Sequence, residues 1–174
     1  MGLGPLAVGH FVITYQPYER VTTMSVAPPL DVSKQISTVF SIANTLRGTY
    51  QPDKYRDVII PMVILRRVEC ALEATKDAVC EAYETNPKIA DAMLRRKSGY
   101  AFYNTSRWTL AKLLGDAPQL HKNLPTYIDA FSPNIKQIFA DLEFDKEITK
   151  MHKGAKLTGV VRKFSELDLD PGHV

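Results

Sequence analysis

The clearest periodic pattern in the chain is a pair of apolar stripes between residues 36 and 79. Apolar side chains recur there in steps of three and four, the spacing of one face of an α-helix. The first stripe comprises Ile36, Val39, Phe40, Ala43 and Leu46, and the second comprises Ile64, Leu65, Val68, Leu72 and Val79. Gly48 suits the left-handed end of a helix, and Pro52 suits the start of the next one. The pattern predicts two packed helices, the second running from about Asp53 towards Tyr83.

The rest of the chain shows helical spacing in shorter pieces. Asn86-Pro87 and Gly99 are expected to end helices, Ser132-Pro133 to start one, and residues 100–106 to form a brief extended segment. Ile135, Ile138, Phe139 and Leu142 are expected to face inwards. Further apolar stripes with helical spacing are Leu124, Tyr127, Ile128 and Phe131, then Ile148 and Met151, and finally Leu157, Val160, Val161 and Phe164. Because no run alternates like a strand, we predict an all-α, multi-helix orthogonal bundle with at most a short strand or hairpin.

The first thirty residues differ in character from the remainder of the chain. The apolar stretch from Gly2 to Ile13 has no positive leading region and no small-residue cleavage site, and it is too short to span a bilayer. Met24 is a plausible alternative start. We therefore expect residues 1–30 to be a loosely ordered extension and residues 31–174 to form one helical domain.

Composition narrows the class of protein. The 174 residues, 45% hydrophobic and 24% charged, suit one soluble domain, and the net charge of +3 permits contact with nucleic acid without predicting it. Cys70 and Cys80 fall on one expected helix, about 15 Å apart along its axis, which is too far for a disulfide and favours a cytoplasmic location. The histidines show no metal-ligand spacing, so no metal site is predicted.

Several ordered segments carry a resemblance. Residues 43–70 read ANTLRGTYQPDKYRDVIIPMVILRRVEC, and FYNTSRWTLAKLLGD, NLPTYIDAFSPNIKQIFADLEFDKEITKM and LTGVVRKFSELDLDPGHV follow in order. Over residues 33–174 the chain resembles the amino-terminal helical domain of the modification (methyltransferase) subunit of type I restriction-modification systems. The resemblance implies a complex with a specificity subunit and a restriction subunit, which transfers a methyl group from S-adenosylmethionine to adenine in DNA.

In that family the helical domain is similar to a lid beside the catalytic domain. The catalytic domain itself needs a glycine-rich turn for S-adenosylmethionine and an Asn-Pro-Pro-aromatic loop for the flipped adenine, and neither occurs in this sequence. Asn86-Pro87 and Ser132-Pro133 are better explained as helix boundaries. We therefore expect no catalytic residue and no bound cofactor here, and we expect this fragment to be inactive alone. The apolar side of residues 157–164 is expected to be left exposed for the missing catalytic domain.

Basic side chains are the candidates for contact with DNA or a partner. Arg66 and Arg67 are adjacent on the second helix, and Lys150, Lys153 and Lys156 gather near the end of the chain. Lysine and arginine neutralise phosphates without reading sequence. Acidic residues interleave with the last group, so an ordinary solvated helix face is the competing interpretation.

Two other sets of residues have plainer interpretations. Six aromatic residues could stack on bases, but helical core is the preferred interpretation: Tyr50, Tyr55, Tyr100, Phe102, Tyr103 and Trp108. Asn104-Thr105-Ser106 is interpreted as a turn or helix cap rather than a nucleophile. A stand-alone helical module that binds protein or DNA without catalysis is the alternative function; an independent enzyme is disfavoured because no triad, paired carboxylates or metal set appears.

Overall fold

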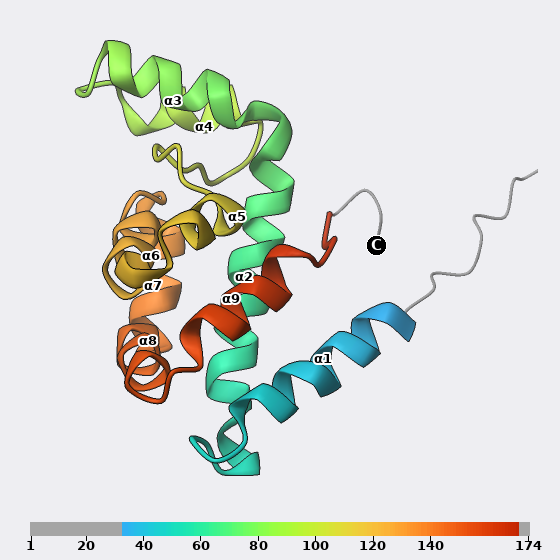
Figure 1. Cartoon of the computed structure of the whole chain (residues 1–174). Coiled ribbons are helices and arrows are strands. Elements are labelled where there is room, and N and C mark those ends of the chain that lie inside the picture. Colours follow the sequence, from blue (N-terminus) through green and yellow to red (C-terminus); the bar gives the residue numbers. More distant parts are fainter. Residues whose placement is uncertain (1–32, 171–174) are drawn as a thin grey trace, which may run out of the picture.

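The computed structural model describes residues 33–170, and these are mainly helical (Figure 1). The helices are α1 (Ser33–Leu46), α2 (Arg56–Leu72), α3 (Lys76–Thr85), α4 (Asp91–Ser98), α5 (Leu110–Leu113), α6 (Leu120–Asp129), α7 (Pro133–Asp141), α8 (Phe144–Lys153) and α9 (Leu157–Ser165). Short 3-10 turns lie at Pro52–Lys54, Glu73–Thr75 and Leu114–Gln119. Extended pairing within residues 33–170 is limited to the isolated bridges Arg47–Tyr50 and Asn104–Phe131. The all-α prediction is confirmed.

Helix α9 occupies the centre of the domain. It crosses α2 and also packs against α1, α5, α6 and α8 (Figure 1). Its apolar side chains are at most 3% exposed: Leu157, Val160, Val161 and Phe164. The predicted stripe that runs from Leu124 on α6 to Phe131, just after this helix, is buried against the same core. The prediction that α9 keeps an exposed patch for a missing domain is therefore wrong, because the surrounding helices cover it.

The most exposed of the large apolar side chains in the described region, Phe40, lies on α1 instead. Ile36, Val39 and Phe40 are 51%, 40% and 68% exposed, and we call this set the α1 outer face. The predicted stripe thus points partly away from the core, and the buried residues are Ile42 and Leu46. The physical reason is that α1 carries apolar side chains on two faces. Spacing alone cannot show which face the core selects.

The long helix predicted from Asp53 to Tyr83 is broken. Helix α2 ends at Leu72, a 3-10 turn follows, and α3 leaves in a different direction (Figure 1). The turn is held from outside, because the Thr75 hydroxyl donates a hydrogen bond to the Ser98 carbonyl at 3.0 Å. Tertiary packing of α3 against α4 therefore overrides the local helical preference.

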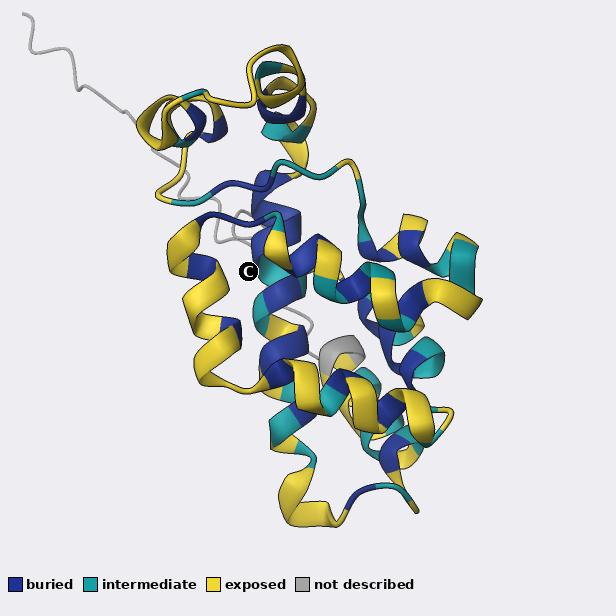
Figure 2. Cartoon of the chain, turned by 90° about the vertical axis from the view of Figure 1, so that its left-hand side faces the viewer, coloured by how far each residue is buried: buried dark blue, intermediate teal, exposed yellow. Residues whose placement is uncertain are grey.

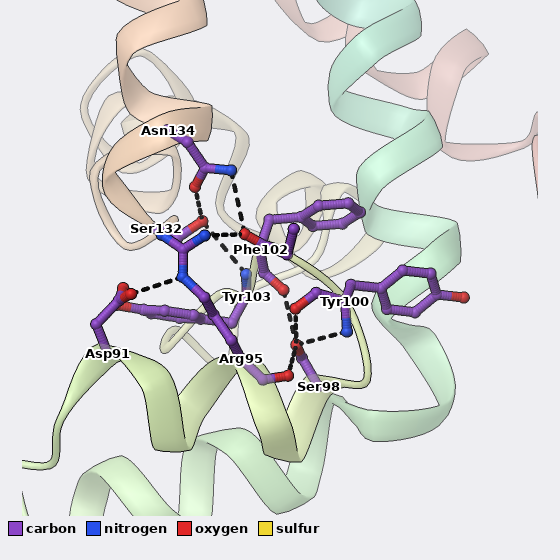
Figure 3. A network of polar contacts seen from close by, with 9 residues as sticks. Asp91, Arg95, Ser98, Tyr100, Phe102, Tyr103, Ser132 and Asn134 are labelled. Carbon is purple, nitrogen blue, oxygen red and sulfur yellow. Dashed lines mark hydrogen bonds and ion pairs between the residues drawn. The ribbon is translucent and has the colours of Figure 1, made fainter.

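Helices α3 and α4 form a hairpin at one end of the domain (Figure 2). The hairpin has a small core of its own, made of Val79, Leu94 and Tyr103. A chain of polar contacts joins this hairpin to the rest of the domain (Figure 3). The Tyr103 hydroxyl donates to Asp91 at 2.9 Å, and the Tyr103 amide donates to the Ser132 hydroxyl at 3.3 Å. Residues 100–106, which were predicted to be extended, lie between the hairpin and α7 in this set of contacts. Their extended pairing consists of one bridge, from Asn104 to Phe131.

The predicted ends of helices agree with the structure better than the predicted core-facing sides of helices do. Gly48 has a φ of 82°, Gly99 has a φ of 75°, and α3 ends immediately before Asn86-Pro87, as expected. Ser132-Pro133 starts α7. On α7 and the turn after it, however, Ile138 and Leu142 are 38% and 36% exposed rather than inward-facing, since only Ile135 and Phe139 lie on the side that meets the core. No helix of the described region is long and apolar enough to cross a membrane.

Candidate nucleic-acid interface

A pocket of about 510 Å³ lies at the connection between α1 and α2, and we call it the basic pocket. The chain turns sharply after Leu46 because Gly48 takes up a left-handed conformation, and the Tyr50 amide then donates to the Leu46 carbonyl at 3.1 Å. Pro52 opens the following 3-10 turn. The pocket is lined by Arg47, Gly48, Thr49, Tyr50, Gln51, Pro52, Lys54, Tyr55 and Lys150.

The end of α8 closes one side of this pocket. A Cβ atom added to Gly154 would lie 2.7 Å from both Cγ2 and Oγ1 of Thr49, so the two segments touch closely and only a glycine fits without a shift. One turn earlier, the Lys150 ammonium lies 4.0 Å from the centroid of the Tyr50 ring, a cation–π contact. The basic pocket is therefore assembled from segments about one hundred residues apart in sequence, between Tyr50 and Lys150.

Tyr50 connects those segments through contacts with α8. Its hydroxyl donates a hydrogen bond to the backbone carbonyl of Glu147 at 3.3 Å, and its ring is 5% exposed. Burial, together with the nearby Glu147 carboxylate, raises the pKa of Tyr50 well above its ordinary value. The phenol thus stays neutral and fixes α8 against the α1–α2 connection.

The electrostatics of the basic pocket favour an anion. Arg47 and Lys150 are exposed and form no ion pair within residues 33–170, and no carboxylate lines the pocket. Lys54 lies 3.7 Å from Asp57, a partly exposed pair that offsets little of its charge. Lys153 is exposed at the end of α8, and the half-buried Lys156 follows in the turn to α9. Such an arrangement can bind the phosphates of nucleic acid.

The five predicted contact residues separate into two groups. Lys150 lines the basic pocket, with Lys153 and Lys156 close by in sequence. Arg66 and Arg67 lie elsewhere on α2, where their side chains donate to the carbonyls of Leu167 at 2.6 Å and Leu169 at 3.4 Å. Arg66 is only 17% exposed, and it is used to hold the end of the chain. A role for any of the five in binding DNA stays a prediction.

Sequence reasoning missed Arg47 and Lys54, although both stand in the LRGTYQPDKY segment that carries the family resemblance. Glu69 is also absent from the apolar stripe predicted on the second helix, yet it is only 6% exposed. Its carboxylate accepts hydrogen bonds from the Leu110 amide and the Tyr127 hydroxyl, both at 2.8 Å, and from Arg66 at 2.6 Å. The sequence did contain a signal, because Glu69 has the helical spacing of the neighbouring core residues Leu65 and Leu72. A charged residue at such a position is buried only when it is paired, so partners for Glu69 could have been expected.

The aromatic residues belong mainly to the core. Tyr50 and Tyr103 are buried, Tyr55, Phe102 and Trp108 pack against the core at intermediate exposure, and Tyr100 is 40% exposed. The core interpretation is therefore confirmed for all but Tyr100.

The segment beginning at Asn104 is a turn, as expected. The Asn104 side-chain oxygen accepts from the Ser106 amide at 2.7 Å, and its nitrogen donates to the Tyr127 carbonyl at 3.1 Å. Elsewhere among residues 33–170, no three His, Cys, Asp or Glu side chains gather as a metal site requires.

Comparison with known proteins identifies the family. The model of the HsdM N-terminal domain matches residues 36–164, which is most of the chain. No curated protein and no solved structure matches. The matched region begins on the α1 outer face, contains the whole basic pocket and ends at Phe164 in the central helix. The chain therefore belongs to the family of N-terminal domains of HsdM, the methyltransferase subunit of type I restriction-modification systems.

Proposed function

We propose that this domain helps a type I modification subunit to assemble and to close around DNA in the cytoplasm. In the full complex, the catalytic domain transfers a methyl group from S-adenosylmethionine to adenine, and the specificity subunit selects the site. The helical domain contributes phosphate contacts and protein contacts, and it carries out no chemistry itself. Membership of the family supports this role.

The basic pocket is the observation that carries the DNA part of the proposal. Its cations come from the α1–α2 connection and from α8, and the contact between Thr49 and Gly154 holds those segments together. Cations carried by a folded, concave surface suit a phosphate backbone better than a flexible lysine tail does, because the backbone positions of the cations are already set before binding. Contact with phosphates adds affinity for any DNA sequence, which suits a domain whose partner reads the bases.

The α1 outer face carries the assembly part of the proposal. A helix with apolar side chains on both sides is expected to be covered on both sides when the protein is complete. Because Ile36, Val39 and Phe40 are all large and apolar, the α1 outer face fits a permanent, hydrophobic contact with the remainder of the modification subunit.

Binding to a short DNA duplex, followed by fluorescence anisotropy, tests the DNA contact. Arg47→Gln and Lys150→Gln should each weaken binding and each reduce the slope of log affinity against log salt by about one. Lys88→Gln is the matched control, because Lys88 is an exposed lysine on the α3–α4 hairpin, outside the basic pocket. Equal losses from Lys88→Gln and Lys150→Gln would remove the support for a defined DNA surface.

Calorimetric titration with S-adenosylmethionine tests whether the helical domain binds the cofactor or leaves this to the catalytic domain. The 174-residue chain alone should give no saturable heat, and methyl transfer should appear only when the catalytic domain and the specificity subunit are added. Saturable cofactor binding or methylation by the lone chain would contradict the proposed role.

A further inference from the structure

A second depression lies between the beginning of α2 and the turn that joins α7 to α8. It has a volume of about 530 Å³ and an open mouth, and we call it the acidic groove. Four carboxylates and two large apolar side chains dominate its lining: Asp57, Asp141, Glu143, Glu147, Ile60 and Leu142. The acidic groove and the basic pocket share no lining residue and are opposite in charge, and they adjoin where Asp57 lies 3.7 Å from Lys54.

The walls of the acidic groove are apolar and uncovered. Ile60 is 48% exposed on α2, and Leu142 is 36% exposed just after α7. Each is extended by a further exposed residue about one helical turn away, Val63 at 37% and Ile138 at 38%. Two short apolar strips therefore flank the acidic groove, which is the form of surface that receives the apolar side of a helix.

The charges of the acidic groove are balanced only in part. Arg56 is the one cation in its lining and lies 3.5 Å from Asp57, which also lies 3.7 Å from Lys54 of the basic pocket. Lys146 pairs with Glu143, and the Asp141 carboxylate accepts only a neutral hydrogen bond, from Gln137 at 2.7 Å. The Oε2 atom of Glu147 is buried and accepts no hydrogen bond in the described part of the chain. Neither Asp141 nor Glu147 forms an ion pair among the described residues, and an ammonium or guanidinium entering the acidic groove would supply the missing positive charge.

We propose that the acidic groove docks a helix of a partner protein that carries lysine or arginine side chains beside an apolar face about two turns long. The inference rests on the proposed function, since it assigns a surface for assembly with another subunit. DNA does not fit, because the carboxylates would repel its phosphates. The charged rim also distinguishes the acidic groove from the uncharged α1 outer face, because interfaces between separate subunits are more polar than permanent ones.

The probe is a synthetic, dye-labelled helical peptide of about four turns, with leucines along one face and lysines on both flanks. It is titrated with the full 174-residue chain, and anisotropy is measured. Saturable binding is expected, whereas the same peptide with glutamate in place of lysine should not bind over the same concentrations. Ile60→Ser and Glu147→Gln should each weaken binding by about tenfold or more, because each removes a contact at the centre of the acidic groove.

Met93→Ser and Glu81→Gln are the matched controls. Met93 is 47% exposed on α4, close to the exposure of Ile60, and Glu81 is an exposed carboxylate on α3. Both variants should bind the peptide like the unaltered chain, and melting curves should show that all four variants are folded. Equal binding of the lysine and glutamate peptides, or equal losses from Met93→Ser and Ile60→Ser, would overturn the proposal. So would a dimer, seen by sedimentation, that Ile60→Ser dissociates, since the occupant would then be a second copy of this chain.

The two proposals fail separately. Ile60→Ser should leave DNA affinity unchanged, because Ile60 lies outside the basic pocket, and Lys150→Gln should leave peptide affinity unchanged. Loss of DNA binding with retained peptide binding would therefore count against the proposed DNA contact alone. The converse would count against the acidic groove alone.

Discussion

Removing one hydroxyl group, in Tyr127→Phe, tests how the core is held around a buried charge. Tyr127 is completely buried on α6, and its hydroxyl donates to Oε2 of Glu69 on α2 at 2.8 Å. The same oxygen accepts from the Leu110 amide, and Oε1 accepts from Arg66. One carboxylate thereby joins α2, α5 and α6, and Arg66 extends the connection to the Leu167 carbonyl beyond α9.

The expected loss is set by the contacts that remain. Phenylalanine keeps the ring and its packing, so no large cavity forms, and the carboxylate keeps two of its donors. A hydrogen bond to a charged group contributes about 1.5–3 kcal/mol, and we expect Tyr127→Phe to lower the free energy of unfolding by about 2 kcal/mol. Tyr83→Phe is the control, because Tyr83 is 37% exposed, and its effect should stay within about 0.5 kcal/mol.

The loss should also depend on pH. Burial, and then the Glu69 carboxylate, raise the pKa of Tyr127 well above its ordinary value of 10.0. The folded chain therefore keeps the phenol proton at a pH where the unfolded chain releases it. The stabilisation is complete below a pH of about 10 and is lost as the pH rises above it, so the difference between the unaltered chain and Tyr127→Phe should narrow there.

Urea unfolding followed by circular dichroism measures both effects. If Tyr127→Phe and Tyr83→Phe were equally stable at neutral pH, the hydroxyl–carboxylate bond would contribute nothing and the reasoning would be refuted. A more stable Tyr127→Phe would mean that the desolvation of the Glu69 charge outweighs its hydrogen bonds.

Three further results are expected. Phe164→Ala should cost about 3–5 kcal/mol in unfolding experiments, because Phe164 is completely buried, whereas Phe40→Ala on the α1 outer face should change stability by less than about 0.5 kcal/mol. Gly154→Ala should lower stability by about 1–3 kcal/mol through its clash with Thr49, and a second change, Thr49→Ala, should recover most of that loss in a double-mutant cycle. Deleting residues 1–23, which lie outside the described residues, should leave the thermal midpoint nearly unchanged; a large decrease would show that they pack on the domain.

Local signals in the sequence were sufficient to predict where several helices begin or end. Gly48, Gly99 and Pro133 act through their own backbone preferences, so each could be interpreted without knowing the fold. The side of a helix that meets the core could be predicted only where polar residues occupy the other side. On α6 they do, and the stripe from Leu124 to Phe131 was correct.

Long-range contacts decided what local signals could not. Helix α1 is apolar on two faces, and its inner face is set by α9, more than one hundred residues later. The break after Leu72 depends on Ser98, which accepts the Thr75 hydroxyl. The basic pocket depends on Gly154 reaching Thr49, so Lys150 could be proposed as a contact residue but its neighbours Arg47 and Lys54 could not.

The α3–α4 hairpin has a consequence for how the domain unfolds. Its core contains only Val79, Leu94 and Tyr103, far fewer apolar side chains than the main core, and so it has less burial to hold it closed. It can therefore open as a unit once its contacts with the rest of the domain are broken, among them the ion pair of Glu84 with Arg107 and the bond of Tyr103 to Ser132. Amide protons of α3 and α4 should exchange with solvent by such partial openings, faster than those of α9, which exchange only when the whole domain unfolds.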